Sequence, residues 1–160
     1  MQFRYPVLTA TKGVPKFAIP GVEIGIGSHD NPAFLMQIIS ELGNPHIVID
    51  DGSHHVDHVE STLRILWPYI QDGGIYIIED THTSYWKYHG GGYLKRKTIV
   101  ELGKHSIDVL HQPYARRKMP NRVQFLSGIL SSITVHNSII VLEERTTAIN
   151  PKQVEFGVFD

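Results

Sequence analysis

Two stretches of the sequence decide the fold: Ile47-Val-Ile-Asp-Asp-Gly-Ser-His-His-Val-Asp-His58 and Gly73-Gly-Ile-Tyr-Ile-Ile-Glu-Asp-Thr-His-Thr-Ser-Tyr-Trp86. In each stretch an apolar, β-branched run ends abruptly in acidic residues. This pattern is typical of a buried parallel strand that presents polar side chains at the edge of a sheet. Because the carboxyl ends of parallel strands meet at one edge, we expect the two sets of carboxylates to lie close together.

The segments around these two strands alternate between strand and helix. Residues 22–26 form a further predicted strand, and Asn31-Pro32 begins a predicted helix that ends at Gly43. An apolar stripe from Val56 to Ile70 predicts a second helix between the strands at 46–50 and 75–78. This order predicts an α/β fold with a parallel βαβαβ unit and right-handed helical crossovers.

The rest of the chain divides into simpler parts. We expect an irregular N-terminal segment at 1–21, one α/β domain at 22–146 and a C-terminal tail at 147–160. Within the domain, the sequence after the third strand predicts a mobile aromatic loop at 81–92 and a helix at about 94–110. A loop at 111–122 and an antiparallel hairpin with strands at 132–136 and 138–143 follow.

Composition excludes several classes of protein. The 160 residues suffice for one domain, and 15 Lys and Arg against 16 Asp and Glu imply no field-driven affinity for nucleic acid or membrane. No apolar run approaches the roughly 18 residues of a membrane span, and there is no signal peptide pattern. We therefore expect a cytoplasmic protein with a small-molecule partner. The ten histidines direct attention to metals and proton transfer.

Four acidic residues fall at the carboxyl ends of the predicted strands: Asp50, Asp51, Glu79 and Asp80. Converging carboxylates without matching lysines or arginines repel one another, and a divalent cation relieves that repulsion. Oxygen donors favour Mg²⁺, with Ca²⁺ or Mn²⁺ as alternatives. The structural alternative is that Asp51 caps a helix and Asp80 solvates a loop.

His54 follows three residues after Asp51, at the same predicted edge. Imidazoles exchange protons near neutral pH, so His54 is a candidate general base. It could equally be a solvated histidine at a helix N-terminus, or, with His58 at i+4, part of a zinc site.

Three further features have weaker interpretations. Gly25-Ile-Gly27 predicts an ordinary strand-to-helix turn, because a glycine pair alone is a weak nucleotide-binding signal. The basic run at 116–118 is most simply a solvated loop, with an anionic ligand as the alternative. The aromatic side chains beside Gly90-Gly91-Gly92 fit either a flat, hydroxyl-rich ligand or a subunit contact; they are Tyr85, Trp86, Tyr88 and Tyr93.

Three motifs together resemble those of a known family: Ile49-Asp-Asp-Gly-Ser-His54, Gly73-Gly-Ile-Tyr-Ile-Ile-Glu-Asp80 and Thr83-Ser-Tyr-Trp86. They are similar to motifs of the macrocin and mycinamicin sugar O-methyltransferases and the related cephalosporin-hydroxylase-like group. Those proteins are class I S-adenosylmethionine-dependent methyltransferases that use magnesium. The resemblance runs from about residue 22 to residue 144 and implies a partial Rossmann-like methyltransferase sheet followed by the hairpin.

The resemblance also implies roles for single residues. The family's metal ligands fall on Asp51, Glu79 and Asp80, and its catalytic base falls on His54. The remaining implied contacts are with the cofactor, at Asp50, Ser28 and His29, and with the substrate, at His82, Tyr85 and Trp86.

The implied function is O-methylation of a hydroxyl on a sugar or other small natural-product acceptor, with Mg²⁺ and S-adenosylmethionine as cofactors. Magnesium would bind vicinal hydroxyls, and His54 would remove the proton of the oxygen that attacks the methyl group. Two alternatives remain. One is a non-catalytic remnant that binds a small ligand or a protein partner, and the other is a metal-dependent enzyme without the methyl donor.

The chain departs from the family pattern before residue 22. The family's glycine-rich cofactor loop and first two βα units have no counterpart there, and in the family sheet those strands separate the third strand from the fourth. We therefore expect residues 22–26 to move beside 46–50, to pair with N-terminal residues, or to leave an edge that a second subunit covers. The last possibility favours a homo-oligomer.

Overall fold

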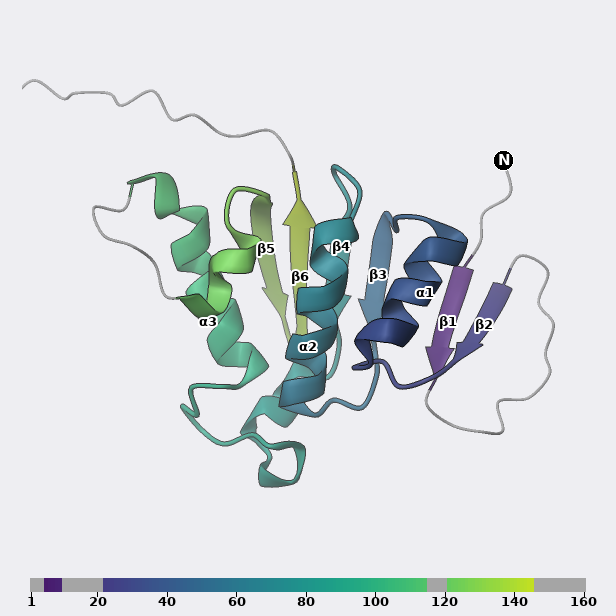
Figure 1. Ribbon diagram of the computed structural model, residues 1–160. Coiled ribbons are helices and arrows are strands. Elements are labelled where there is room, and N and C mark those ends of the chain that lie inside the picture. The colour runs from purple at the N-terminus through teal and green to yellow at the C-terminus, as the bar shows by residue number, and fades with distance from the viewer. Residues whose placement is uncertain (1–4, 10–21, 115–120, 146–160) are drawn as a thin grey trace, which may run out of the picture.

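The computed structural model describes residues 5–9, 22–114 and 121–145 (Figure 1). Within these ranges the chain forms six strands and three α-helices. The strands are β1 (Tyr5–Thr9), β2 (Val22–Ile26), β3 (Ile47–Asp50), β4 (Ile75–Ile78), β5 (Leu130–His136) and β6 (Ile139–Glu144). The helices are α1 (Pro32–Leu42), α2 (Val56–Leu66) and α3 (Ile99–Leu110), and none of the described helices is long and apolar enough to cross a membrane.

The main sheet has four strands in the order β3-β4-β6-β5. β3 and β4 are parallel, with Asp50 opposite Ile78, and β6 runs antiparallel to both β4 and β5. The predicted parallel pair and C-terminal hairpin are therefore confirmed. The hairpin turn is Asn137-Ser138 rather than Asn137 alone, because Ser138 takes a left-handed conformation with φ 64°.

β2 differs from the expected continuous βαβαβ sheet. Among the described residues it is not hydrogen-bonded to β3 but pairs in parallel with β1, as a separate two-stranded sheet with Tyr5 opposite Val22. Part of the segment expected to be irregular, 1–21, is therefore a strand, and the N-terminal residues supply the neighbour of β2. The residues expected as a C-terminal tail, 147–160, lie outside the described ranges.

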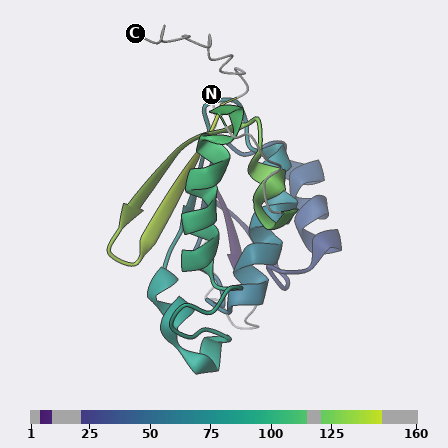
Figure 2. The same ribbon diagram turned by 90° about the vertical axis from the view of Figure 1, so that its left-hand side faces the viewer.

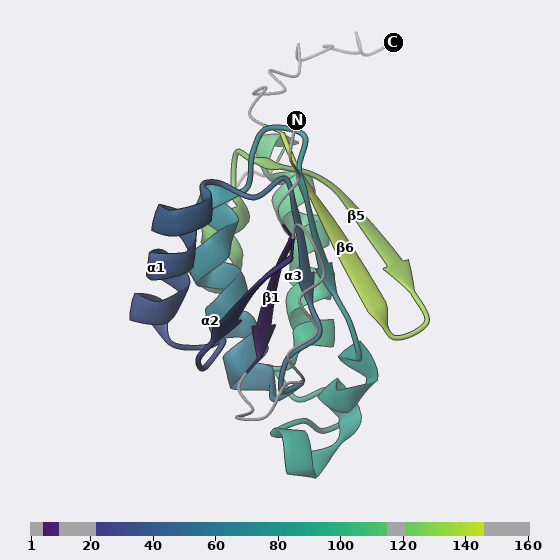
Figure 3. The same ribbon diagram turned by 90° about the vertical axis from the view of Figure 1, so that its right-hand side faces the viewer.

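The three helices pack against one face of the main sheet. Figure 3 shows α1 and α2 together on one side, and Figure 2 shows α3 beside the β5–β6 hairpin. Side chains of this face alternate with the strand period, so Tyr76, Ile78, Ile140 and Leu142 are buried. Buried residues of the helices complete one core with them, namely Leu35, Val59, Leu63, Leu66, Ile99, Leu102 and Val109.

The opposite face of β3 carries exposed apolar side chains. Ile47 is 57% exposed and Ile49 is 59% exposed, whereas Asp50 on the helix-covered face is only 6% exposed. Apolar area of this kind on a sheet face marks a surface that a further element or partner covers in many proteins.

Local sequence signals set the helix ends. Asn31 caps α1 by accepting a hydrogen bond from the Ala33 N–H at 3.0 Å, and Gly43 ends α1 with φ 83°, both as predicted. α3 starts at Ile99, five residues after the expected start at Leu94. Leu94 has φ 55°, which no helix residue adopts, and the Thr98 hydroxyl caps α3 instead by accepting from the Glu101 N–H at 3.3 Å.

Candidate functional site

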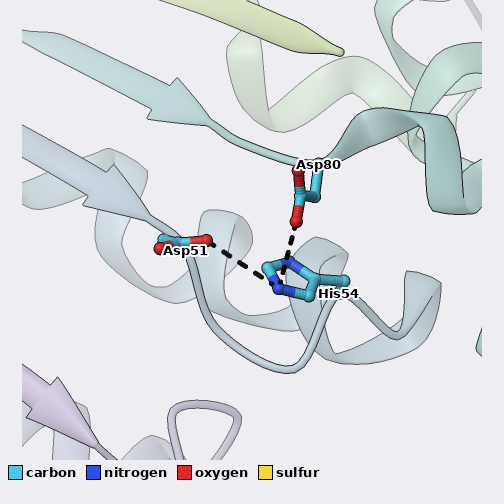
Figure 4. Close-up of side chains that lie close together, drawn as sticks. All are labelled: Asp51, His54 and Asp80. Carbon is cyan, nitrogen blue, oxygen red and sulfur yellow. Dashed lines mark ion pairs between the residues drawn. The ribbon is translucent and has the colours of Figure 1, made fainter.

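Three predicted site residues converge at the carboxyl edge of β3 and β4. Asp51 follows β3, Asp80 follows β4 after Glu79, and His54 lies in the loop before α2 (Figure 4). His54 Nε2 is 3.5 Å from Asp80 Oδ2 and 3.8 Å from Asp51 Oδ1. One ligand atom from each of the three lies within 4.8 Å of those of the other two.

The backbone at this cluster is unusual. His54 has φ 56° and Asp80 has φ 50°, so both adopt the left-handed conformation, which few residues other than glycine take. Such a conformation costs about 1–3 kcal/mol and persists only where the surroundings hold it. The two residues of the cluster with this backbone conformation are therefore two whose side chains contact each other.

The donor set suits a divalent cation. Two carboxylates supply hard oxygen donors for Mg²⁺ or Mn²⁺, and an imidazole nitrogen is a ligand that Mn²⁺ and Zn²⁺ accept. The ion pairs found for Asp51 and Asp80 within the described ranges are with imidazoles: His54 contacts both, and His82 Nδ1 lies 3.8 Å from Asp80 Oδ1. No lysine or arginine in that set neutralises the two carboxylates.

Glu79, the other predicted ligand, is not among the three converging residues. It is partly exposed, and its N–H donates to the Asp50 carbonyl at 3.0 Å, which continues the β3–β4 ladder. Its role as a ligand stays a prediction.

Asp50 is not one of the three converging residues. Its carboxyl is buried and accepts a 2.8 Å hydrogen bond from the Tyr76 hydroxyl. Burial raises the pKa of Asp50, and the hydrogen bond from Tyr76 and the nearby His29 oppose this shift only in part. Burial also raises the pKa of Tyr76 well above 10, and the Asp50 charge adds to that effect. Asp50 is therefore committed to a buried pair.

The other two predicted cofactor contacts lie beside the loop that follows β3. The His29 ring packs on Gly52, where an added Cβ would be 2.7 Å from Nδ1, and His29 Nε2 accepts from the Ser53 N–H at 3.3 Å. The Ser28 hydroxyl donates to Asp30. His29 is thus close to the cluster, whereas Ser28 is engaged with its own loop.

His58 is directed away from His54. Its Nδ1 lies 2.9 Å from the Ser53 hydroxyl, and its Nε2 lies 3.6 Å from Asp30 Oδ2. It is not part of the cluster of possible ligands found among the described residues, so the geometry gives the zinc alternative with His54 no support.

The predicted substrate contacts begin directly after the cluster. The segment 81–92 forms two short 3₁₀ turns, Thr81–Tyr85 and Lys87–His89, and Thr81, Thr83 and Ser84 are buried. The His82 ring contacts the Trp86 ring at 4.6 Å between centroids, and Tyr85 stacks on Tyr93 at 6.5 Å. The loop is thus anchored by its small residues, while its aromatic rings are exposed.

A hollow of about 360 Å³ lies beside these rings. His82 and Tyr85 form one wall, α3 forms a second through residues such as Ile107, and the hairpin turn forms the third. His82 Nδ1 lies 2.6 Å from the Ser138 hydroxyl of that turn. His82 therefore stands between the hollow and Asp80.

Sequence reasoning missed two residues that hold this site. Tyr76 could have been found, because it is the one polar side chain in an otherwise aliphatic strand and shares the face of Asp50 through the strand period. Thr83 could not have been found in this way, because its hydroxyl contacts the carbonyls of His54 and Asp80, which lie in loops after two different strands.

The fold and the site together define the class. The main sheet joins a parallel pair to an antiparallel hairpin, with helices on one face and carboxylates at the edge of β3 and β4. This arrangement matches the fold of class I S-adenosylmethionine-dependent methyltransferases.

Comparison with known proteins narrows the class further, although no family model matches the sequence. The chain is 36% identical over 121 residues to 8-demethyl-8-(2-methoxy-alpha-L-rhamnosyl)-tetracenomycin-C 3'-O-methyltransferase of Streptomyces olivaceus, covering 74% of this chain and 31% of that protein. It is 43% identical over 65 residues to mycinamicin VI 2''-O-methyltransferase of Micromonospora griseorubida, covering 41% of this chain and 16% of that protein.

A solved structure agrees with these relatives. The MycE methyltransferase from the mycinamycin pathway, in complex with Mg, SAH and mycinamycin VI, matches with a TM-score of 0.79 and 25% identity over 89% of this chain and 36% of that chain. The chain spans about a third of the length of the tetracenomycin 3'-O-methyltransferase and of MycE. Over that span it is related to the sugar O-methyltransferases of the macrocin and mycinamicin group, as its motifs predicted.

Proposed function

We propose that the chain carries the metal and base part of a magnesium-dependent O-methyltransferase that methylates a sugar hydroxyl of a small natural-product glycoside. The observation that carries the proposal is the convergence of Asp51, His54 and Asp80 at the edge of two parallel strands. The relatives support it, because their names describe methylation of sugar hydroxyls on such compounds, and MycE was solved with Mg and SAH.

Asp51 and Asp80 are the proposed metal ligands, with Glu79 as the third that the family resemblance implies. A divalent cation held there polarises hydroxyl groups of the acceptor and makes them more acidic. The two carboxylates otherwise face each other with only imidazoles as ion-pair partners among the described residues, so a cation also relieves their repulsion.

His54 is the proposed general base, acting at Nε2. This atom faces both carboxylates, whereas Nδ1 is buried and has no hydrogen-bond partner within the described part of the chain. In the proposed reaction the acceptor O–H proton passes to Nε2. The oxygen bonds to the methyl carbon of the donor, and the carbon–sulfur bond breaks with its electron pair left on sulfur.

The acceptor would lie along the aromatic loop. His82, Tyr85 and Trp86 are the proposed contacts, since His82 adjoins Asp80, Tyr85 lines the hollow, and the exposed Trp86 ring contacts the His82 ring. Aromatic faces next to a few hydrogen-bonding groups suit a sugar ring with an apolar attachment.

S-adenosylmethionine as the methyl donor rests on the relatives more than on the residues present. Ser28, His29 and Asp50 are the proposed contacts; His29 lies against Gly52 beside the cluster, and its buried Nδ1 has no partner among the described residues. Asp50 would act mainly by fixing the end of β3, because its carboxyl already accepts from Tyr76.

A homo-oligomer in the cytoplasm completes the proposal. The exposed side chains of Ile47 and Ile49, on one face of β3, support a covered surface there, since contiguous exposed apolar area often marks a protein contact. Light scattering after size-exclusion chromatography at micromolar concentration should give a mass above 18.1 kDa. A monomeric mass would contradict this part of the proposal alone.

Calorimetric titration tests the function. We expect heat from Mg²⁺, and from S-adenosylmethionine and S-adenosylhomocysteine in the presence of Mg²⁺. Binding of Mg²⁺ without either sulfur compound would favour a metal-dependent protein without the methyl donor. An absence of heat from all three would favour the non-catalytic alternative and overturn the proposal.

A further inference from the structure

Thr83 connects the two residues of the cluster that have left-handed backbones. Its side chain is buried, with 5% of the residue exposed. Its Oγ1 lies 2.8 Å from the Asp80 carbonyl oxygen and 3.0 Å from the His54 carbonyl oxygen. The hydroxyl has one proton, so it donates to both carbonyls as a shared hydrogen bond.

These two carbonyls are the groups whose direction the left-handed conformation changes. The Asp80 carbonyl also accepts from the Thr83 N–H at 3.0 Å, which closes the first 3₁₀ turn after β4. The His54 carbonyl, in contrast, belongs to the separate loop after β3. The hydroxyl of Thr83 is therefore a direct link between the ends of the two strands that supply the site.

Thr83 is itself held firmly in place. The Ser84 hydroxyl accepts from the Val100 N–H at 3.2 Å, at the start of α3, and the Ser84 carbonyl accepts from the Gly92 N–H at 2.8 Å. Gly91 packs so closely that an added Cβ would lie 2.6 Å from the Thr83 carbonyl oxygen. Contacts with α3 and the glycine run thus help to hold the hydroxyl in place, in addition to its hydrogen bonds with the Asp80 and His54 carbonyls.

We propose that Thr83 is a positioning residue that fixes the separation of Asp80 from the loop carrying Asp51 and His54, and so sets the affinity of the site for a divalent cation. The proposal rests on the proposed metal function of the site. Thr83 is assigned no ligand role: its hydroxyl is directed at the two backbone carbonyls. It acts by holding two strained backbones in the conformations that bring their side chains together.

Thr83→Val tests the proposal, because valine keeps the shape and removes the hydroxyl. We expect the Mg²⁺ affinity measured by calorimetry to fall about 10–100-fold, the range typical of lost outer-shell hydrogen bonds at metal sites. Thr83→Ser keeps the hydroxyl and should retain affinity within about threefold of the parent protein. Mn²⁺ titration followed by electron paramagnetic resonance provides a second readout that needs no turnover.

Thr62 offers a matched control. It is equally buried, at 3% exposed, and its Oγ1 also lies near two carbonyl oxygens, those of His29 at 2.8 Å and His58 at 3.0 Å. Thr62→Val should lower the melting temperature about as much as Thr83→Val but leave Mg²⁺ affinity unchanged. If Thr83→Val does not fold, Thr83→Ala takes its place in the comparison.

The outcomes separate the two proposals. A parent protein that binds no Mg²⁺ overturns the metal site, and the role of Thr83 with it. A parent protein that binds Mg²⁺ while Thr83→Val binds equally well overturns the role of Thr83 alone. Equal losses of affinity in Thr83→Val and Thr62→Val would mean that any buried hydroxyl matters, which also overturns it.

Discussion

The Tyr76 hydroxyl donates a 2.8 Å hydrogen bond to the Asp50 carboxyl, and both groups are buried in the layer between β3, β4 and the helices. Asp50 directly precedes Asp51 in the chain. The pair therefore fastens the end of β3, from which the Asp51 side chain extends into the cluster.

Tyr76→Phe should destabilise the fold by about 1–3 kcal/mol, because it leaves the buried Asp50 carboxyl without its donor. Urea unfolding measures the change. Tyr114→Phe is the control, since Tyr114 is 69% exposed, and it should stay within about 0.5 kcal/mol of the parent. Equal stability of the two variants would show that the hydrogen bond does not hold β3.

Asp51→Asn and Asp80→Asn should each weaken Mg²⁺ binding at least about tenfold, because each removes one charged oxygen donor. Asparagine tolerates the left-handed backbone at Asp80, so the second change tests the charge without disturbing the chain. Calorimetry gives the affinity, and the melting temperatures should stay close to that of the parent.

Glu79→Gln is the informative third variant, since Glu79 lies outside the converging group. Because Glu79 is the proposed third ligand, we expect a loss of affinity similar to that of Asp51→Asn or Asp80→Asn. A much smaller loss would remove Glu79 from the proposed ligands. Unchanged binding in all three variants would show that the cation binds elsewhere.

Glu60→Gln should reveal a pH-dependent contribution to stability. Burial raises the pKa of Glu60, but hydrogen bonds and charges from Arg122 and Arg64 outweigh this effect and hold the pKa below the usual value of 4.5 for a glutamate. A carboxyl with a lowered pKa stabilises the fold above its unfolded pKa, and this contribution is lost as pH falls through the folded pKa.

The parent should therefore exceed Glu60→Gln in unfolding free energy by about 2 kcal/mol at pH 7, the scale of a charge-assisted hydrogen bond. The difference should shrink as the pH is lowered below 4.5. Unfolding curves at several pH values measure it. A difference that is constant from pH 7 to pH 3 would contradict the role assigned to the charge of Glu60.

Much of the site could be predicted from the sequence because strand periodicity and motif spacing are local. The ends of β3 and β4 brought Asp51, His54 and Asp80 together as expected. Asp50 was expected to converge with them but is not in the cluster. Alternation along β3 places its carboxyl on the helix-covered face, where it pairs with Tyr76. Period-two reasoning applied one residue further would have separated Asp50 from Asp51.

Other features depend on contacts between segments that are distant in the sequence, so local sequence patterns could not predict them. The pairing of β2 with β1 is a choice between strand partners, which the pattern of 22–26 alone does not specify. The late start of α3 follows from Leu94, whose left-handed backbone has no signature in an apolar residue. Thr83 became visible only when the His54 and Asp80 carbonyls were placed beside it.

The alternation along β3 has a further consequence for how the sequence can change. Asp50 faces the core and Asp51 faces the cluster, although the two are adjacent and chemically identical. Deletion of one residue between Ile47 and Asp50 would move Asp51 into the buried position of Asp50 and take its carboxylate away from the cluster. The site therefore depends on the number of residues in β3 as much as on the presence of acidic residues, because that number decides which carboxylate reaches the cluster.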